Sequence, residues 1–374
     1  MTELGVLSTP CLLLDHDRAR RNAARVGARV TALGARLRPH IKTHKCVEVA
    51  RLQVAGHFGG ITVSTLAEAR AFAAHGFTDI TYAVPVEPGK FGAAVALAQA
   101  GVRLALLTDD PAIPGLLGEA SRRAGVTFDL FVKVDCGYHR CGVDPAGPLL
   151  VEIAQRIGER SSLRFAGILT HAGHAYHARG AEAIGAIARE ERDVMTAAAA
   201  KLRAAGISVP VISVGSTPTI MHVDHLEGVD EVRVGNYAFF DLTQATLGTC
   251  TAEDGVLSVL AAVVHRDTTR RQVVIDAGAI AISKDRGAVE FDAAAGFGRL
   301  LDLEGRDLGV RLGSLSQEHG TASVEDAALL GRLAVGTRVR VLVNHSCLTA
   351  AQHAEYVVHE GLEVRDRWAI HRGW

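Results

Sequence analysis

The feature of the sequence that most constrains the fold is a regular alternation of two kinds of segment between Arg36 and Leu242. Short runs of β-forming residues that end in turn or polar residues alternate with stretches rich in Ala, Leu and Arg that have a helical period. The expected strands span residues 36–41, 59–65, 79–85, 103–109, 127–135, 163–170, 209–214 and 230–234. Eight βα units in roughly 200 residues favour a parallel (β/α)8 barrel of the TIM type. A flavodoxin-like or Rossmann sheet is the alternative, but no GxGxxG follows the first strand.

A second domain is expected after about Thr249, where the helical stretches give way to β-rich segments. VLSVLAAVVHR, RQVVIDAGAIAI, TRVRVLVNHSC and EYVVHEGLEVRDRW are separated by glycine or acidic turns, which is typical of a mostly antiparallel β domain. We expect the amino-terminal segment TPCLLLD to pair with it. The predicted domains are therefore residues 16–248 for the barrel, and residues 1–15 together with 249–374 for the β domain.

The composition argues against several classes of protein. The chain has 40 Lys and Arg residues against 41 Asp and Glu residues, so it lacks the cationic surface that a nucleic-acid-binding protein uses to displace counterions. No apolar stretch reaches the roughly 18 residues that span a bilayer, and the amino terminus has no basic segment of the signal-peptide kind. Six scattered cysteines without a signal peptide predict free thiols in a reducing cytoplasm.

The segment RLRPHIKTHK, residues 36–45, places Lys42 where the first expected strand ends. The active site of a barrel forms at the carboxyl ends of its strands, so a lysine there points its amine into the mouth. Basic neighbours such as Arg38 and His40 lower the pKa of a lysine and make its amine nucleophilic. A solvated surface lysine is the alternative.

Two turns at the ends of the last two expected strands have the composition of a phosphate site. In ISVGSTPT, residues 212–219, a strand runs into Gly-Ser-Thr, which leaves backbone N–H groups and hydroxyls for a phosphate, and VRVGNY, residues 232–237, adds a second glycine and an Asn-Tyr pair. Ordinary turn chemistry is the alternative for either turn alone. The residues expected to bind the cofactor here are Gly215, Ser216, Thr217, Gly235, Asn236 and Tyr237.

The segment VNHSCLTAAQH, residues 343–353, contains a potential metal site. His345 and Cys347 are separated by one residue, so on a strand both side chains project from the same face and can reach one ion. An imidazole and a thiolate suit zinc. A packed cysteine beside a hydrogen-bonded histidine is the alternative.

Taken together, these segments resemble the D-serine dehydratase and D-threonine aldolase family of pyridoxal-phosphate (PLP) enzymes, which have the alanine racemase-like fold, called fold type III. RPHIKTHK resembles the Schiff-base motif of the family, VSTLAEAR its second-strand segment, and SVGSTPT with LEGVDEVRVGNYAFFD its phosphate region. GSLSQEHG, NHSCLTA and the closing DRW and RGW resemble its carboxyl-terminal domain. The match runs nearly from end to end and implies a homodimer.

The resemblance also implies roles for individual residues. Lys42 would carry PLP as a Schiff base and take the α-proton of the substrate, with His40 also at the cofactor. Arg140, in VKVDCGYHRCGV, stands where the family has a basic residue near the pyridine nitrogen, and Tyr176, in THAGHAY, would be a second catalytic residue beside the ring. An arginine at that nitrogen weakens the ring as an electron sink, and a Lewis-acid metal on the β-hydroxyl of the substrate is the natural substitute.

The metal motif favours one branch of the family. Bacterial D-threonine aldolases typically have His-x-Asp, whose oxygen ligand suits Mn²⁺ or Mg²⁺ better, whereas the dehydratase branch resembles this chain in having His-x-Cys. The sequence therefore predicts a zinc-dependent lyase that converts D-serine to pyruvate and ammonia. The alternatives are a D-threonine aldolase or a 3-hydroxy-D-aspartate lyase and, in another class, a PLP carrier without turnover.

Overall fold

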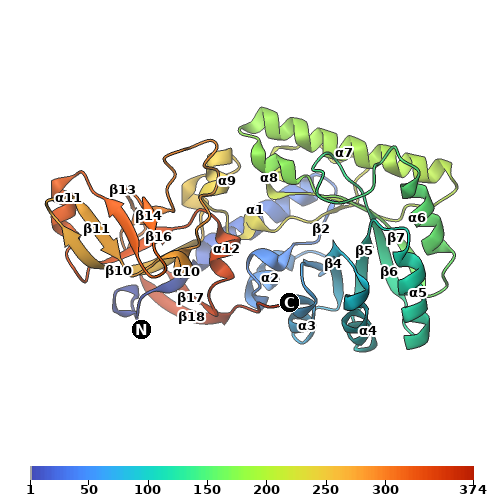
Figure 1. Cartoon of the computed structure of the whole chain (residues 1–374), viewed down its shortest axis with the longest axis horizontal. Coiled ribbons are helices and arrows are strands. Elements are labelled where there is room, and N and C mark those ends of the chain that lie inside the picture. Colours follow the sequence, from blue (N-terminus) through green and yellow to red (C-terminus); the bar gives the residue numbers. More distant parts are fainter. Residues whose placement is uncertain (1) are drawn as a thin grey trace. The chain divides into compact units, whose positions relative to one another are not determined.

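The computed structural model describes residues 2–374, which form two compact units (Figure 1). Unit 1 contains the chain up to Ala24 together with Thr43–Val49 and Asn236–Ile370. Unit 2 contains Arg25–Lys42, Ala50–Gly235 and His371–Trp374. Across residues 2–374 no helix has both the length and the apolar character needed to cross a membrane.

Unit 2 is built on an eight-stranded parallel sheet with the order β2-β9-β8-β7-β6-β5-β4-β3. Its strands are β2 (Arg36–Leu37), β3 (Ile61–Val63), β4 (Asp79–Pro85), β5 (Arg103–Thr108), β6 (Phe128–Lys133), β7 (Leu163–Leu169), β8 (Ile212–Val214) and β9 (Glu231–Val232). The two end strands meet through a parallel bridge between His40 and Thr62, so the sheet curls into a barrel. All eight expected strands are present, and the predicted barrel is confirmed.

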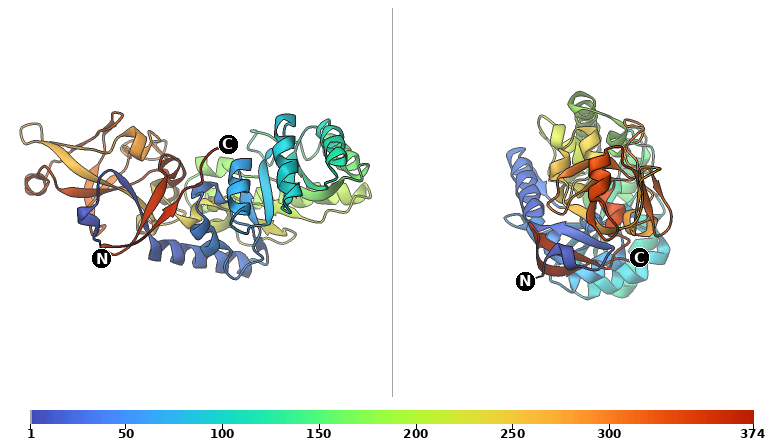
Figure 2. Two further views of the ribbon diagram at one scale, coloured as in Figure 1. Left: turned by 90° about the horizontal axis from the view of Figure 1, so that it is seen from below. Right: turned by 90° about the vertical axis from the view of Figure 1, so that its left-hand side faces the viewer.

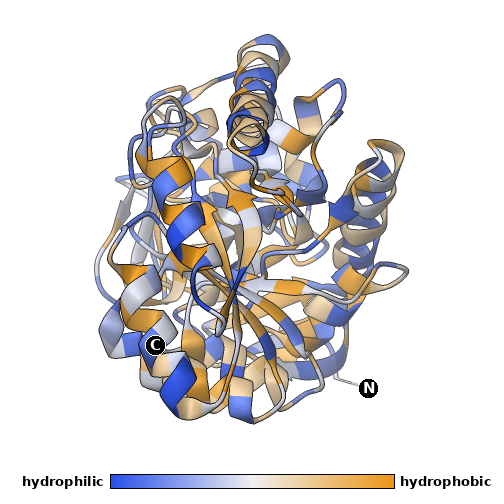
Figure 3. Ribbon diagram, turned by 90° about the vertical axis from the view of Figure 1, so that its right-hand side faces the viewer, coloured by the Kyte–Doolittle hydropathy of each residue, from blue (hydrophilic) through white to orange (hydrophobic). Residues whose placement is uncertain are grey.

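Helices of unit 2 follow the strands and pack outside them, as α5, α6 and α7 do beside β5–β7 in Figure 1. Figure 3 shows hydrophobic residues along the strands and hydrophilic residues on the outer turns of the helices, the pattern that buries one helix face against a sheet. A capping box between Thr65 and Glu68 starts α3, and Gly125 in the left-handed conformation ends α5. The helices are α1 (His16–Ala32), which begins in unit 1, α2 (Val47–Val54), α3 (Leu66–Ala73), α4 (Phe91–Gln99), α5 (Ile113–Ala124), α6 (Leu149–Gly158), α7 (Ala181–Ala204) and α8 (Thr217–His222).

Unit 1 is built on a mostly antiparallel sheet with the order β13-β12-β16-β10-β1-β17-β18, to which β11, β14 and β15 are attached. The strands are β1 (Cys11–Asp15), β10 (Leu257–Asp267), β11 (Gln272–Ile275), β12 (Arg299–Leu301), β13 (Asp307–Arg311), β14 (Ser314–Leu315), β15 (Gly320–Ser323), β16 (Arg338–Leu342), β17 (Glu355–Glu360) and β18 (Glu363–Ala369). Its short helices are α9 (Leu242–Leu247), α10 (Ala279–Ile282), α11 (Ala327–Arg332) and α12 (Ser346–Ala350).

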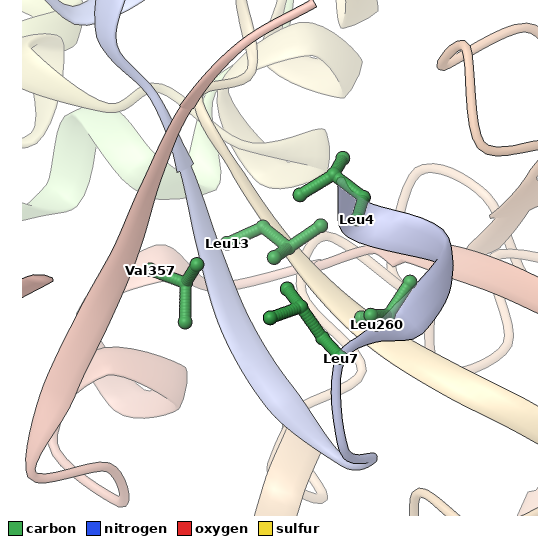
Figure 4. Close-up of a cluster of buried hydrophobic side chains, with 5 residues drawn as sticks. All are labelled: Leu4, Leu7, Leu13, Leu260 and Val357. Atoms are coloured by element: carbon green, nitrogen blue, oxygen red, sulfur yellow. The ribbon is translucent and has the colours of Figure 1, made fainter. Parts of the chain in front are cut away.

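The amino-terminal strand β1 lies inside the unit 1 sheet, between β10 and β17. In Figure 2 the amino-terminal segment (blue) lies beside strands from the end of the chain (red). It pairs antiparallel with β10 and parallel with β17, which confirms the expected pairing of TPCLLLD with the second domain. Leu13 of β1 packs in a buried cluster with the four side chains that Figure 4 labels beside it, which are Leu4, Leu7, Leu260 and Val357. This cluster joins the beginning of the chain to its last strands.

Candidate cofactor and metal sites

Lys42 lies in a single 3-10 turn, Ile41–Thr43, at the carboxyl end of the first barrel strand. The ladder of β2 covers only Arg36–Leu37. Beyond it, Arg38 N and His40 N still donate to Val232 O and Val234 O at 2.9 and 2.8 Å. The expected strand 36–41 is thus too long, and the turn carries Lys42 beyond the sheet. The Lys42 N–H donates to His40 Nδ1 at 3.4 Å, and the Lys42 side chain is exposed.

Unit 2 concentrates positive charge near the carboxyl ends of its strands. Lys133 at the end of β6 and Arg233 just after β9 are both 5% exposed. Burial, and after it the charge of Arg233, lowers the pKa of Lys133 to about 8. Burial, and after it the charges of Lys42 and Lys133, holds the pKa of His171 well below its usual range. These cations converge on one region, which suits an anionic ligand such as a phosphate ester.

The Gly-Ser-Thr turn after β8 is held by a residue that the sequence did not single out. Gly215 has a φ of +121°, its N–H donates to Glu191 Oε1 at 3.0 Å, and its C=O accepts from His171 Nδ1 at 3.1 Å. Ser216 caps α8, and its N–H donates to Thr219 Oγ1 at 3.1 Å. Two N–H groups that the sequence assigned to a phosphate therefore donate within the chain, because a buried carboxylate and a helix cap take them. Thr217 is the first residue of α8 and is buried.

The second predicted phosphate turn, after β9, divides between the two units. A Cβ atom at Gly235 would come within 2.4 Å of His40 O, so only glycine fits there. In unit 1, Asn236 Nδ2 donates to Asp241 Oδ2 at 2.8 Å and lies 3.9 Å from Cys347 Sγ. Tyr237 is fully buried. The Asn236 amide group thus belongs to the surroundings of the predicted metal ligands.

The two residues that the resemblance placed at the cofactor ring lie on loops of unit 2. Arg140 is exposed on the loop after β6, with its guanidinium carbon 5.0 Å from the centre of the Tyr138 ring. That ring makes an edge contact with His171 at 6.1 Å. Tyr176 is partly buried in the 3-10 helix Gly173–His177 that follows β7. The sequence missed His171, the ring that the charge of Lys42 affects.

The predicted metal ligands lie at a turn from a strand to a helix. The sequence placed both on a strand, but β16 ends at Leu342, His345 is the extended residue before α12, and Cys347 lies in the first turn of that helix. The chain turns here because Asp241 Oδ2 accepts hydrogen bonds from both the N–H and the hydroxyl of Ser346, each at 3.0 Å. The two side chains still meet in a hydrogen bond.

Hydrogen bonds around this pair favour the metal-binding form of the thiol. His345 Nδ1 lies 2.6 Å from Asp285 Oδ2, which leaves Nε2 for Cys347 or an ion. Burial alone would lower the pKa of His345, but the hydrogen bonds to Asp285 and Cys347 outweigh it and raise this pKa to about 11. Burial alone would raise the pKa of Cys347, but His345 and a 3.3 Å contact with Thr43 Oγ1 outweigh it and lower this pKa. The thiolate, the form that binds metals, is therefore favoured.

Comparison with protein-family models divides the chain at nearly the same place as the sequence pattern. Residues 14–243 match the model described as the amino-terminal domain of alanine racemase. Residues 256–359 match the model described as a serine dehydratase domain.

Known proteins match the chain over almost its whole length. D-threo-3-hydroxyaspartate dehydratase from Delftia sp. is 41% identical and aligns over 99% of both chains. D-serine dehydratase from Dictyostelium discoideum is 32% identical over 100% of this chain and 98% of that protein. The solved structure of the Delftia enzyme covers 100% of both chains with a TM-score of 0.96, and one solved form is a cysteine-to-alanine variant described as metal-free. The D-threonine aldolase from Filomicrobium marinum is 29% identical and has a TM-score of 0.86, with 98% of this chain and 96% of that chain covered.

Proposed function

Because the chain belongs to the alanine racemase-like family of D-serine dehydratases and D-threonine aldolases, and is thus a PLP-dependent lyase, we propose that it dehydrates β-hydroxy D-amino acids with the help of zinc. D-threo-3-hydroxyaspartate is the first candidate substrate, since the relative with 41% identity acts on it. D-serine, the substrate expected from the sequence, is the second candidate for the same reaction. The observation that carries the proposal is the His345–Cys347 pair with Asp285 behind the imidazole.

The residues of unit 2 fit PLP. The phosphate ester of PLP is anionic, and the buried side chains of Lys133 and Arg233 supply positive charge near the carboxyl ends of the strands. When bound, PLP supplies an aldehyde carbon that a lysine amine can attach and a ring that withdraws electrons. We assign the attachment to Lys42 Nζ, because Lys42 lies in a turn at the carboxyl end of a barrel strand. The Lys42 N–H of this turn donates to His40 Nδ1.

Three further roles are assigned to groups of unit 2. Lys42 Nζ is also assigned to take the α-proton of the substrate, because it is the amine at the carboxyl end of the first barrel strand. The loops after β7, β8 and β9, with Tyr176, Gly215 and Gly235, orient the cofactor. Arg140 is assigned to the ring nitrogen.

The residues of unit 1 fit a zinc ion. Asp285 holds His345 Nδ1, so an ion can take the place of the Cys347 thiol at Nε2, and the lowered pKa of Cys347 favours the thiolate. Asn236 Oδ1 is a buried oxygen with no hydrogen-bond partner among residues 2–374, so a donor group such as an ion-bound water would satisfy it. When bound, zinc supplies Lewis acidity toward a hydroxyl oxygen. The metal-free form of a cysteine variant of the Delftia enzyme supports a metal role for the cysteine of this family.

The test is product analysis on three substrates, with and without a chelator. We expect oxaloacetate and ammonia from D-threo-3-hydroxyaspartate and pyruvate and ammonia from D-serine, both lost on chelation. Glycine and glyoxylate from D-threo-3-hydroxyaspartate, or glycine and acetaldehyde from D-threonine, would show that the reaction is retro-aldol cleavage and not dehydration. Absence of turnover by protein that binds PLP would favour the carrier alternative.

Variants separate the two cofactors. Lys42→Ala should abolish the visible absorption near about 420 nm that a lysine-bound PLP gives. Cys347→Ala should keep this absorption but lose zinc and turnover, because the thiolate binds the ion and not PLP. Cys250→Ala, a second cysteine of unit 1, should keep all three properties. Full turnover by Cys347→Ala in metal-free buffer would remove zinc from the proposal.

A further inference from the structure

We infer that Glu191 is a positioning residue whose buried carboxyl group fixes the loops after β7 and β8 in the shape that receives the cofactor. The inference rests on the proposed function, because it takes these loops as the PLP site. Glu191 lies in the middle of α7 and does not itself contact PLP in this proposal. It acts through the backbone that it holds.

The carboxyl group of Glu191 ties three segments together. It is 2% exposed, and Oε1 accepts from Ala172 N at 3.1 Å and from Gly215 N at 3.0 Å. Its second oxygen, Oε2, accepts from Thr219 Oγ1 at 3.2 Å. Ala172 belongs to the loop after β7, Gly215 follows β8, and Thr219 belongs to α8. One side chain thus accepts hydrogen bonds from the loop after β7, from the turn after β8 and from α8.

The contact with Gly215 also fixes the His171 ring. Gly215 C=O accepts from His171 Nδ1 at 3.1 Å, so the neutral imidazole carries its hydrogen on Nδ1 and its lone pair on Nε2. Gly215 has a φ of +121°, and a Cβ atom there would lie 3.2–3.3 Å from Val232 and from the Arg233 N–H. The backbone at Gly215 is therefore confined to the one orientation that its two hydrogen bonds set. Glu191 and His171 hold the same residue from its two sides.

A merely structural contact between α7 and the sheet would not need a carboxyl group. Burial raises the pKa of Glu191 against the opposing effect of Gly215, Ala172 and Arg233, which means that its charge is costly at this position. Other positions on the inner face of α7 are occupied by Met195, Ala198 and Leu202. An acidic residue among them is explained by the donors that it satisfies, since a buried N–H group without a partner destabilises its loop.

The experiment measures PLP affinity, by titrating the visible absorption of the apoprotein, in three variants. Glu191→Leu leaves the Ala172 and Gly215 N–H groups without their acceptor and should weaken PLP binding by at least about tenfold. Glu191→Gln should stay within about threefold of wild type, because its carbonyl oxygen accepts both N–H groups and its amide donates to Thr219 Oγ1. Met195→Ala, one turn further along the same buried face, should lower the melting temperature without changing PLP affinity.

A second readout does not depend on PLP. In the apoprotein, Glu191→Leu should speed hydrogen exchange in the peptides that contain Ala172 and Gly215, and Met195→Ala should not. Should Glu191→Leu fail to fold, Thr219→Val removes the hydroxyl that donates to Glu191 Oε2 and accepts from the Ser216 N–H, and it should weaken PLP binding by at least about threefold. Wild-type affinity and exchange in a folded Glu191→Leu protein would overturn the inference. Wild-type protein that binds no PLP would instead overturn the proposed function, while the exchange result still decides whether Glu191 holds the loops.

Discussion

At the scale of single residues, carboxylates prepare both candidate sites. Asp285 holds His345, Asp241 holds the Ser346 backbone and Glu191 holds the loop at Gly215. Each carboxylate fixes the orientation of a functional group before any ligand binds. Side chains arranged in this way lose little entropy when the ligand binds.

The first residue prediction concerns Asp285→Asn. This change removes the negative charge behind His345 Nδ1, so zinc affinity should fall about 10- to 100-fold while PLP absorption stays unchanged. Competition with a chromophoric chelator measures the affinity. Asp292→Asn is the matched control, because Asp292 lies in the same segment but pairs with Arg311 at 2.8 Å. Equal zinc affinity in both variants would contradict the role of Asp285.

A second residue prediction concerns acid stability. Burial, and after it the charge of Arg340, lowers the pKa of His359 from 6.5 to about 4. Below about pH 6.5 the unfolded chain binds a proton that the folded chain binds only near pH 4, so His359 should remove about 2–3 kcal/mol of stability over this interval. His359→Gln should flatten this part of the pH dependence of the free energy of unfolding, measured with urea. The exposed His265→Gln should leave the curve as in wild type, and an unchanged curve for His359→Gln would contradict the assignment.

At the scale of elements, Asp241 connects two short helices of unit 1. Its Oδ1 accepts from Gln244 N at 3.0 Å and so caps α9, while Oδ2 accepts from Ser346 at the start of α12. The turn that carries His345 and Cys347 is thereby fastened to a segment about a hundred positions earlier in the chain. The position of the ligands depends on this long-range contact and not on the strand before them.

Asp241→Ala should therefore affect both stability and metal binding. Loss of the helix cap alone should cost about 1 kcal/mol, and the freed Ser346 N–H should let the turn move and weaken zinc binding about tenfold or more. Thermal unfolding and chelator competition measure the two effects. Asp326→Ala removes the cap of α11 in the same unit and is the control for a cap without a metal site. Stability loss without any change in zinc affinity would separate Asp241 from the site.

The sequence predicted the elements better than the turns between them. All eight barrel strands follow from local periodicity, which a segment carries by itself. The turn at Lys42 and the helix start at Ser346 could not be read in this way, since Val232, Val234 and Asp241 decide them from far along the chain. Glu191 was missed because it stands in a run of charged residues, REER, that has the appearance of a solvated helix face. Only the fold shows that one of these side chains is buried.

At the scale of the whole molecule, the two units interleave along the sequence. Lys42 is the last residue of one unit 2 segment, and Thr43, which contacts the Cys347 thiol, is the first residue of the unit 1 segment that follows. The predicted domain limits of 16–248 stay a prediction, and they place this short segment with the barrel. One peptide bond thus joins the candidate cofactor lysine to a neighbour of the candidate metal ligand.

Leu13→Ala tests how unit 1 depends on its central strand. Leu13 is fully buried in the cluster with Leu260 and Val357, so the truncation should cost about 2–5 kcal/mol of the free energy of unfolding. Denaturant unfolding followed by circular dichroism measures this cost. Val6→Ala, at a position that is 75% exposed nearby, should be close to neutral. A small effect at Leu13 would contradict the central place of β1.

The position of β1 has a consequence for the order in which the molecule is made. Residues 11–15 are synthesised long before the partners of this strand, because β10 begins at residue 257 and β17 at residue 355. All eight barrel strands are complete by residue 232. At roughly 5–20 residues per second, the first strand therefore waits from about a quarter of a minute to a minute for its second neighbour, with apolar residues unpaired. Closure of the unit 1 sheet around β1 is therefore a late step of folding, because it needs a strand that begins only at residue 355.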